Sequence, residues 1–124
     1  MRKVSLLFVA IAAFTGLAIA QDEATLQPLM KTVAGAGGAM RGAADSAAAK
    51  ADAEKAADAF EKIGAFFKTK NMADAVAFAA AGADAAKAIA GGADKATTLP
   101  KMMATCMGCH TAHREGAAPN FKLK

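Results

Sequence analysis

Apolar residues recur every three or four positions along most of the chain, in four segments separated by short polar or glycine-bearing breaks. This spacing puts apolar side chains on one face of an α-helix. The segments predict helices at about residues 26–43, 46–68, 71–90 and 98–115. Strands favour an alternation of β-branched and aromatic residues that the chain does not sustain. Because the breaks are short, the predicted fold is all-α, an antiparallel four-helix bundle.

Local signals set the expected ends of these helices. Asn71 is a suitable N-cap for the third helix, and Gly91 with Gly92 is a suitable stop. The fourth helix is expected to open near Thr98, with Pro100 in its first turn, and to end at Gly116.

Four glycines interrupt the first predicted helix: Gly35, Gly37, Gly38 and Gly42. Each costs about 1 kcal/mol relative to alanine inside a helix. One interpretation is that the helix frays or bends near residues 35–38. The other is that the small residues let a flat ligand or another helix approach the backbone closely.

The first twenty residues have the pattern of a secretory signal peptide. A basic start is followed by an apolar run that ends at Ala18-Ile19-Ala20, a small-residue cleavage site. The run is short for a bilayer span, so we expect cleavage, export to the periplasm and no stable membrane insertion afterwards. The mature chain, residues 21–124, is expected to be one domain.

Composition limits what this domain can do. Of the 124 residues 55% are hydrophobic, but most of these are alanine, and there is no Trp or Tyr. Small apolar side chains bury little area, and small domains of this kind often add a disulfide, a metal or a cofactor. Removal of Arg2 and Lys3 lowers the net charge from +4 to +2. Acidic and basic residues are interleaved, which is typical of a solvated helix face and excludes a patch for nucleic acid.

The sequence Cys106-Met107-Gly108-Cys109-His110 is the C-x-x-C-H attachment motif of c-type haem. Two thiols at this spacing can each add to one vinyl group of a haem, and the adjacent imidazole can bind the iron. Both cysteines of the chain lie in the motif. Three other interpretations are open: a redox dithiol, a zinc site that also uses His113, and inert packing of the two cysteines.

The position of the motif resembles that in the class II c-type cytochromes, which include cytochrome c′ and the low-spin cytochrome c-556 type. In that family it lies in the last helix of a four-helix bundle, and here Arg114 follows it where members often have a basic residue. Leu29-Met30-Lys31 and Gly38-Ala39-Met40 are similar to the first helix of the c-556 type. The resemblance implies one haem c on Cys106 and Cys109, with His110 and Met30 as axial iron ligands.

Such a protein is an electron carrier and not an enzyme, because a six-coordinate His/Met haem moves single electrons and binds little else. The expected partners are redox proteins, and a homodimer is left open. Two alternatives remain: a five-coordinate, cytochrome c′-like protein in which Met30 only crowds the haem and the iron binds NO or CO, and a haem-free zinc or thiol module.

The chain also departs from the family. His113 stands where members usually have an aromatic residue, and we expect it to pack or to face solvent. No Arg precedes Met30, so the family's partners for the haem propionates do not transfer. Lys31 and Arg41 are left as candidates for that role.

Overall fold

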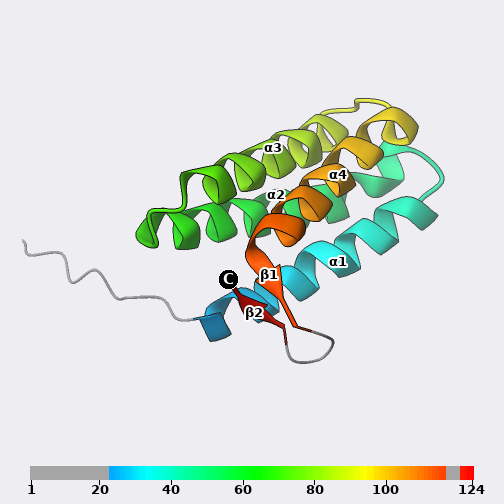
Figure 1. Cartoon of the computed structure of the whole chain (residues 1–124). Helices are drawn as coiled ribbons and strands as arrows, with labels where there is room; N and C mark the ends of the chain where they lie inside the picture. Colours follow the sequence, from blue (N-terminus) through cyan, green and yellow to red (C-terminus); the bar gives the residue numbers. More distant parts are fainter. Residues whose placement is uncertain (1–22, 117–120) are drawn as a thin grey trace, which may run out of the picture.

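The computed structural model describes residues 23–116 and 121–124. A short 3-10 turn, η1 (Glu23–Thr25), leads into four helices, α1 (Leu26–Gly42), α2 (Ser46–Thr69), α3 (Ala73–Ala90) and α4 (Lys95–His113). Consecutive helices run in opposite directions and pack side by side (Figure 1). The predicted all-α, four-helix architecture is confirmed.

Two short strands that the sequence pattern did not predict complete the fold. They are β1 (Arg114–Glu115) and β2 (Lys122–Leu123), and they pair antiparallel with Arg114 opposite Leu123. The strand pair lies at the end of α4, beside the start of α1 (Figure 1).

The expected signal peptide, residues 1–20, lies outside the described residues. Within the part of the chain that the structure describes, no helix is long and apolar enough to span a membrane.

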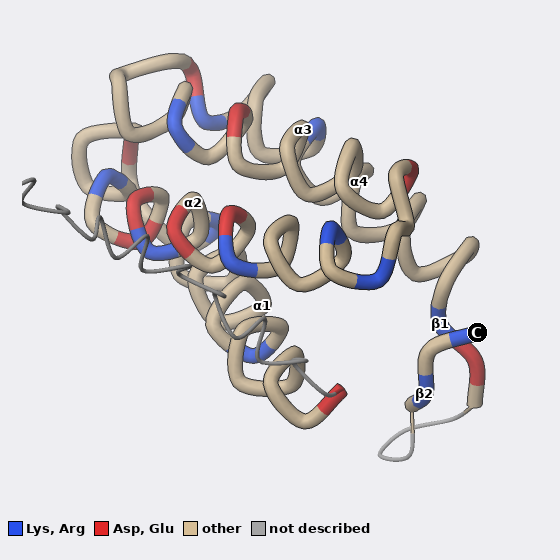
Figure 2. Tube along the Cα trace, turned by 90° about the vertical axis from the view of Figure 1, so that its left-hand side faces the viewer, with Lys and Arg blue, Asp and Glu red and all other residues tan. Residues whose placement is uncertain are grey.

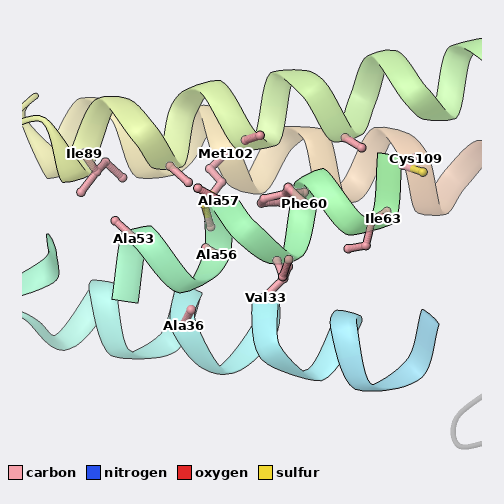
Figure 3. Packing of buried hydrophobic residues seen from close by; sticks show 14 of the residues in the cluster. Val33, Ala36, Ala53, Ala56, Ala57, Phe60, Ile63, Ile89, Met102 and Cys109 are labelled. Atoms are coloured by element: carbon pink, nitrogen blue, oxygen red, sulfur yellow. The ribbon is translucent and has the colours of Figure 1, made fainter. Parts of the chain in front are cut away.

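The core is built mainly from alanines and a few large side chains. Alanines such as Ala49, Ala53 and Ala56 are fully buried on α2, and Phe66 and Phe67 supply the bulk at its far end. Figure 3 shows the buried side chains of all four helices pointing into the shared interior. Because alanine lets helix backbones approach closely, a chain without Trp or Tyr still buries a continuous core.

The four helices are not packed equally. α2 packs closely with α1 and α3, and α4 packs mainly against α3, whereas α1 and α4 contact each other little. One place where they meet is Gly37, where an added Cβ would lie 3.5 Å from Met103 Sδ and 3.7 Å from Met102 Cε. These are ordinary contact distances, so α4 approaches α1 at Gly37 without requiring a glycine there, and Gly35, Gly38 and Gly42 meet nothing within 4 Å. The expected fraying near residues 35–38 is wrong, because α1 is helical throughout that segment.

The predicted start of the fourth helix is wrong by three residues. Asp94 is the N-cap of α4, and its Oδ2 accepts a hydrogen bond from the backbone N–H of Thr97 at 3.1 Å. Carboxylates are strong caps, so the helix begins before Thr98, which is buried instead. Pro100 consequently lies inside α4 and not in its first turn.

Two other helix ends also differ from the prediction. Asn71 does not cap α3: the N-cap is Met72, and Asn71 is in the left-handed region with φ 56°. Asn tolerates that conformation better than most residues, so it serves the turn between α2 and α3. α4 ends at His113 and not at Gly116, because Arg114 has already entered β1. The stop at Gly91 and Gly92 is confirmed, with Gly92 at φ 99°.

Gly82 of α3 is expected to be essential for packing. A Cβ there would lie 2.5 Å from Cε1 of Phe60, whose ring is buried against α3. We expect Gly82→Ala to lower the free energy of unfolding by about 1–3 kcal/mol, the usual cost of overpacking, measured by urea denaturation. Gly35→Ala is the matched control. It meets nothing within 4 Å and should raise stability by about 0.5–1 kcal/mol through helix propensity. Equal stability of the two variants would contradict the close packing of α2 and α3.

Candidate functional site

A cavity of about 450 Å³ lies between the first half of α1 and the end of α4, where these two helices have little contact. Its apolar walls are formed by Leu26, Met30, Ala34, Phe67, Phe121 and Leu123. These residues come from α1, α2 and the chain end, so the cavity is completed by β2 and the residue before it. Its volume is within the range of cofactor and small-molecule sites, about 300–1,000 Å³.

Three of the four predicted site residues line this cavity. Met30 reaches it from α1, and Cys109 and His110 reach it from the last turns of α4. Cys106 is one turn earlier on α4 and does not line it: its thiol donates to the carbonyl oxygen of Met102 at 3.6 Å. Residues three and four apart share a helix face, so Cys106 lies on the same side of α4 as Cys109 and His110.

His110 is partly buried at the cavity wall. Burial lowers the pKa of its imidazole, and the positive charge of Arg114 lowers it further. The neutral form is therefore favoured near neutral pH. Neutral imidazole is also the form that can bind a metal ion.

Burial favours the protonated form of both thiols. Burial raises the pKa of both Cys106 and Cys109, and at Cys109 the negative charge of Asp74 raises it further. Redox dithiols work through a thiolate with a lowered pKa. The electrostatics of this pair therefore disfavour the redox-dithiol interpretation.

The zinc interpretation requires several ligands to converge on one point. Among residues 23–116 and 121–124, no three His, Cys, Asp or Glu side chains are grouped so that they could hold a metal ion. The four candidates on α4 are spread over two turns of one helix, so they do not form a tetrahedral set.

His113 packs, as expected, but it also has a partner that the sequence did not indicate. Its side chain is 15% exposed, and its ring centroid lies 6.4 Å from that of Phe67. Its Nε2–H donates to Oδ2 of Asp74 at 2.7 Å, which links α4 to the first turn of α3. The hydrogen bond fixes the last turn of α4 beside the cavity.

This link gives a pH-dependent contribution to stability. The hydrogen bond from His113 holds the pKa of Asp74 below its ordinary value. The stabilisation is present above the unfolded pKa, about 3.9, and is lost as the pH falls through the folded value. We expect Asp74→Asn to destabilise the protein at pH 5 and to match the wild type at pH 2, measured by urea denaturation. Asp84→Asn, an exposed α3 carboxylate without a hydrogen-bonded partner among the described residues, should show no such difference.

Packing leaves no room for a side chain at Gly108, which lies inside the C-x-x-C-H motif. A Cβ there would lie 2.6 Å from Cε1 of Phe78 on α3. The Phe78 ring therefore covers the backbone of the motif on the side facing α3. Apolar periodicity alone does not indicate this contact, because it does not say which residue of a neighbouring helix a side chain meets.

The chain end is the part of the site that sequence reasoning missed. Phe121, Lys122 and Leu123 line the cavity, although they lie outside the four predicted helices. The only signal is an alternation of apolar and basic residues from 121 to 124, too short to predict a strand. Of the two cations left as propionate partners, Lys31 lines the cavity, while Arg41 lies at the other end of α1.

A comparison of the chain with protein-family models, with curated proteins and with solved structures gave no match. The chemistry of the cavity is therefore the ground for assigning a function. Its lining offers groups that a haem c uses: apolar walls for the ring, the Cys109 thiol, an imidazole kept neutral, and a thioether on α1. The second thiol, Cys106, lies one turn earlier on α4 and outside the lining.

A second, larger hollow of about 750 Å³ lies at the opposite end of the bundle and has no such chemistry. Its polar groups already have partners. Asp45 and Asp94 cap α2 and α4, the Ser46 hydroxyl bonds to the backbone of Ala93 and Lys95, and the Lys95 ammonium binds the carbonyl of Ala43.

Proposed function

We propose that this protein is an exported electron carrier of the class II c-type cytochrome kind. One haem c would be attached through Cys106 and Cys109, with His110 as one axial ligand and Met30 as the other. The observation that carries the proposal is that Met30 of α1 and the Cys109-His110 pair of α4, far apart in the chain, line the same apolar cavity.

Each residue would contribute something different to this function. His110 is already favoured in the neutral, metal-binding form by its burial. Met30, half-buried on α1, offers a soft thioether from the facing wall. With His, such a ligand generally raises the haem potential and fills the coordination site that a gas would need. The haem, when bound, supplies a one-electron redox couple.

The surrounding protein gives the site largely apolar walls and anchors the end of α4. Phe67, Leu26 and Leu123 are among the apolar residues that line the cavity. The His113–Asp74 hydrogen bond and the Phe78 ring on Gly108 hold the end of α4 against α3. Such anchoring would suit electron transfer with redox partner proteins in the periplasm, because electron carriers work best when the site changes little in geometry between oxidation states.

The test is a redox titration of the matured protein. The full chain should be expressed with its signal in a host that attaches c-type haem, and its optical spectrum recorded at controlled potentials with and without carbon monoxide. We expect a reversible one-electron transition, a low-spin ferrous spectrum and no rapid binding of the gas. A high-spin ferrous spectrum with rapid carbon monoxide binding would contradict the proposed electron carrier. It would favour a five-coordinate haem protein that binds gases.

A further inference from the structure

The end of the chain is fixed beside the cavity. β1 and β2 pair through Arg114 with Leu123 and Glu115 with Lys122, and the backbone N–H of Lys124 donates to the carbonyl of His113 at 3.0 Å. The Arg114 guanidinium lies over the Phe121 ring, 4.0 Å from its centroid. This strand pair therefore has a defined position on the cavity wall next to His110.

The strand pair brings positive charge to the cavity. Arg114 and Lys122 line it from the strands, and Lys31 lines it from α1, against a single carboxylate, Glu23. Figure 2 shows basic positions on both strands at this end of the molecule. The cavity thus combines apolar walls with an excess of cations.

These cations differ from four lysines on the outer surface of α2 and α3. Lys50, Lys55, Lys62 and Lys87 each lie within 4.0 Å of a carboxylate. No described carboxylate forms an ion pair with Lys31, Arg114 or Lys122. All three side chains are exposed, so their attraction for an acidic ligand strengthens only where the bound ligand displaces water from them.

We propose that Arg114 and Lys122, carried by the C-terminal strand pair, bind the carboxylates of the ligand that fills the cavity, with Lys31 assisting from α1. The ligand class is a flat, apolar molecule with acidic groups at one edge. Its identity as haem, whose propionates would be those groups, rests on the proposed function. The carboxylate recognition itself requires neither iron nor covalent attachment.

The test uses a probe without iron on the full chain produced without haem maturation. Protoporphyrin IX, a dicarboxylic acid, and its dimethyl ester are each titrated by fluorescence, and circular dichroism reports the helix content. We expect the diacid to bind more tightly than the ester. Arg114→Gln and Lys122→Gln should each weaken binding of the diacid by about two- to fivefold, as for one exposed charge pair, and leave binding of the ester unchanged.

Lys124→Gln is the matched control. It removes the same charge two residues further on, from a side chain that does not line the cavity, and should not change binding of the diacid. Equal binding of diacid and ester, no binding of either, or equal effects of Lys122→Gln and Lys124→Gln would overturn the proposal.

A second measurement uses the matured protein. Its result does not depend on whether the chain folds without haem. Loss of a cation beside a propionate raises the pKa of that propionate, so Lys122→Gln should move the inflection in a plot of midpoint potential against pH to higher pH. Lys124→Gln should leave this inflection in place.

The proposed function and the carboxylate site can fail separately. A diacid preference in a chain that never acquires haem would refute only the cytochrome, and a haem protein insensitive to Lys122→Gln would refute only the carboxylate site.

Discussion

Replacing both Cys106 and Cys109 with alanine is expected to abolish covalent haem attachment while leaving the helical bundle folded. The two thiols are the chain's only cysteines, so no other side chain can form the thioether bonds. Alanine is the best helix former and fits both positions on α4. The measurement is the haem that stays with the polypeptide after acid–acetone extraction, together with circular dichroism of the variant.

The control for this variant is Met107→Ala. Met107 lies between the two cysteines, but its side chain is 67% exposed and points away from the core. It should keep the full haem content, which separates a requirement for the thiols from a general sensitivity of the motif. Covalent haem in the double cysteine variant would refute attachment at this motif.

The second large effect is expected from Met30→Leu, which removes the thioether sulfur with little change in volume. Leucine has no lone pair to offer, so the matured variant should become high-spin and bind carbon monoxide rapidly in the ferrous state. Because the substitution nearly conserves volume, the fold should lose less than about 1.5 kcal/mol. The measurement is the optical spectrum of the ferrous wild type and variant with and without carbon monoxide.

Met40→Leu is the matched control for that experiment. Met40 is fully buried on the same helix but does not line the cavity. Its variant should keep the low-spin spectrum of the wild type. A high-spin spectrum in Met40→Leu and a low-spin one in Met30→Leu would show that Met40, and not Met30, supplies the axial thioether.

The sequence pattern predicted the helices because their apolar faces repeat regularly, as at Ala53, Phe60 and Ile63 of α2, all of which are buried. Its errors lie at helix ends, where single residues decide. Asp94 caps α4 before Thr98, where the helix was expected to open, and Asn71 has a left-handed turn conformation in place of a capping one. Periodicity carries no information about such local competition between caps and turns.

The site was predicted only in part. The C-x-x-C-H motif is local in sequence, so Cys109 and His110 could be found without a fold, and Met30 followed from the resemblance of its helix to the c-556 type. Phe67, Phe121 and Lys122 could not be found that way. They reach the cavity through the packing of α2 and the pairing of two-residue strands, which have no periodic signal.

An alanine-rich chain is expected to bury little area per side chain, and the structure shows where its few large side chains lie. Phe60, Phe66 and Phe67 are all buried on α2, so three of the five phenylalanines in the described residues lie on this helix, which packs closely with both α1 and α3. The remaining space lies between α1 and α4, where the cavity is. A large flat cofactor would pack against Phe67 and Leu26 there.

The central claim is that this chain carries one covalently bound haem, and mass spectrometry of the matured wild type tests it most directly. Trypsin cleaves after Lys101 and Arg114, so one peptide, residues 102–114, contains both cysteines and His110. We predict that this peptide carries exactly one iron-containing haem, joined through Cys106 and Cys109. A colourless protein that yields the same peptide with two free thiols, after expression in a host that matures a known c-type cytochrome alongside it, would contradict the account.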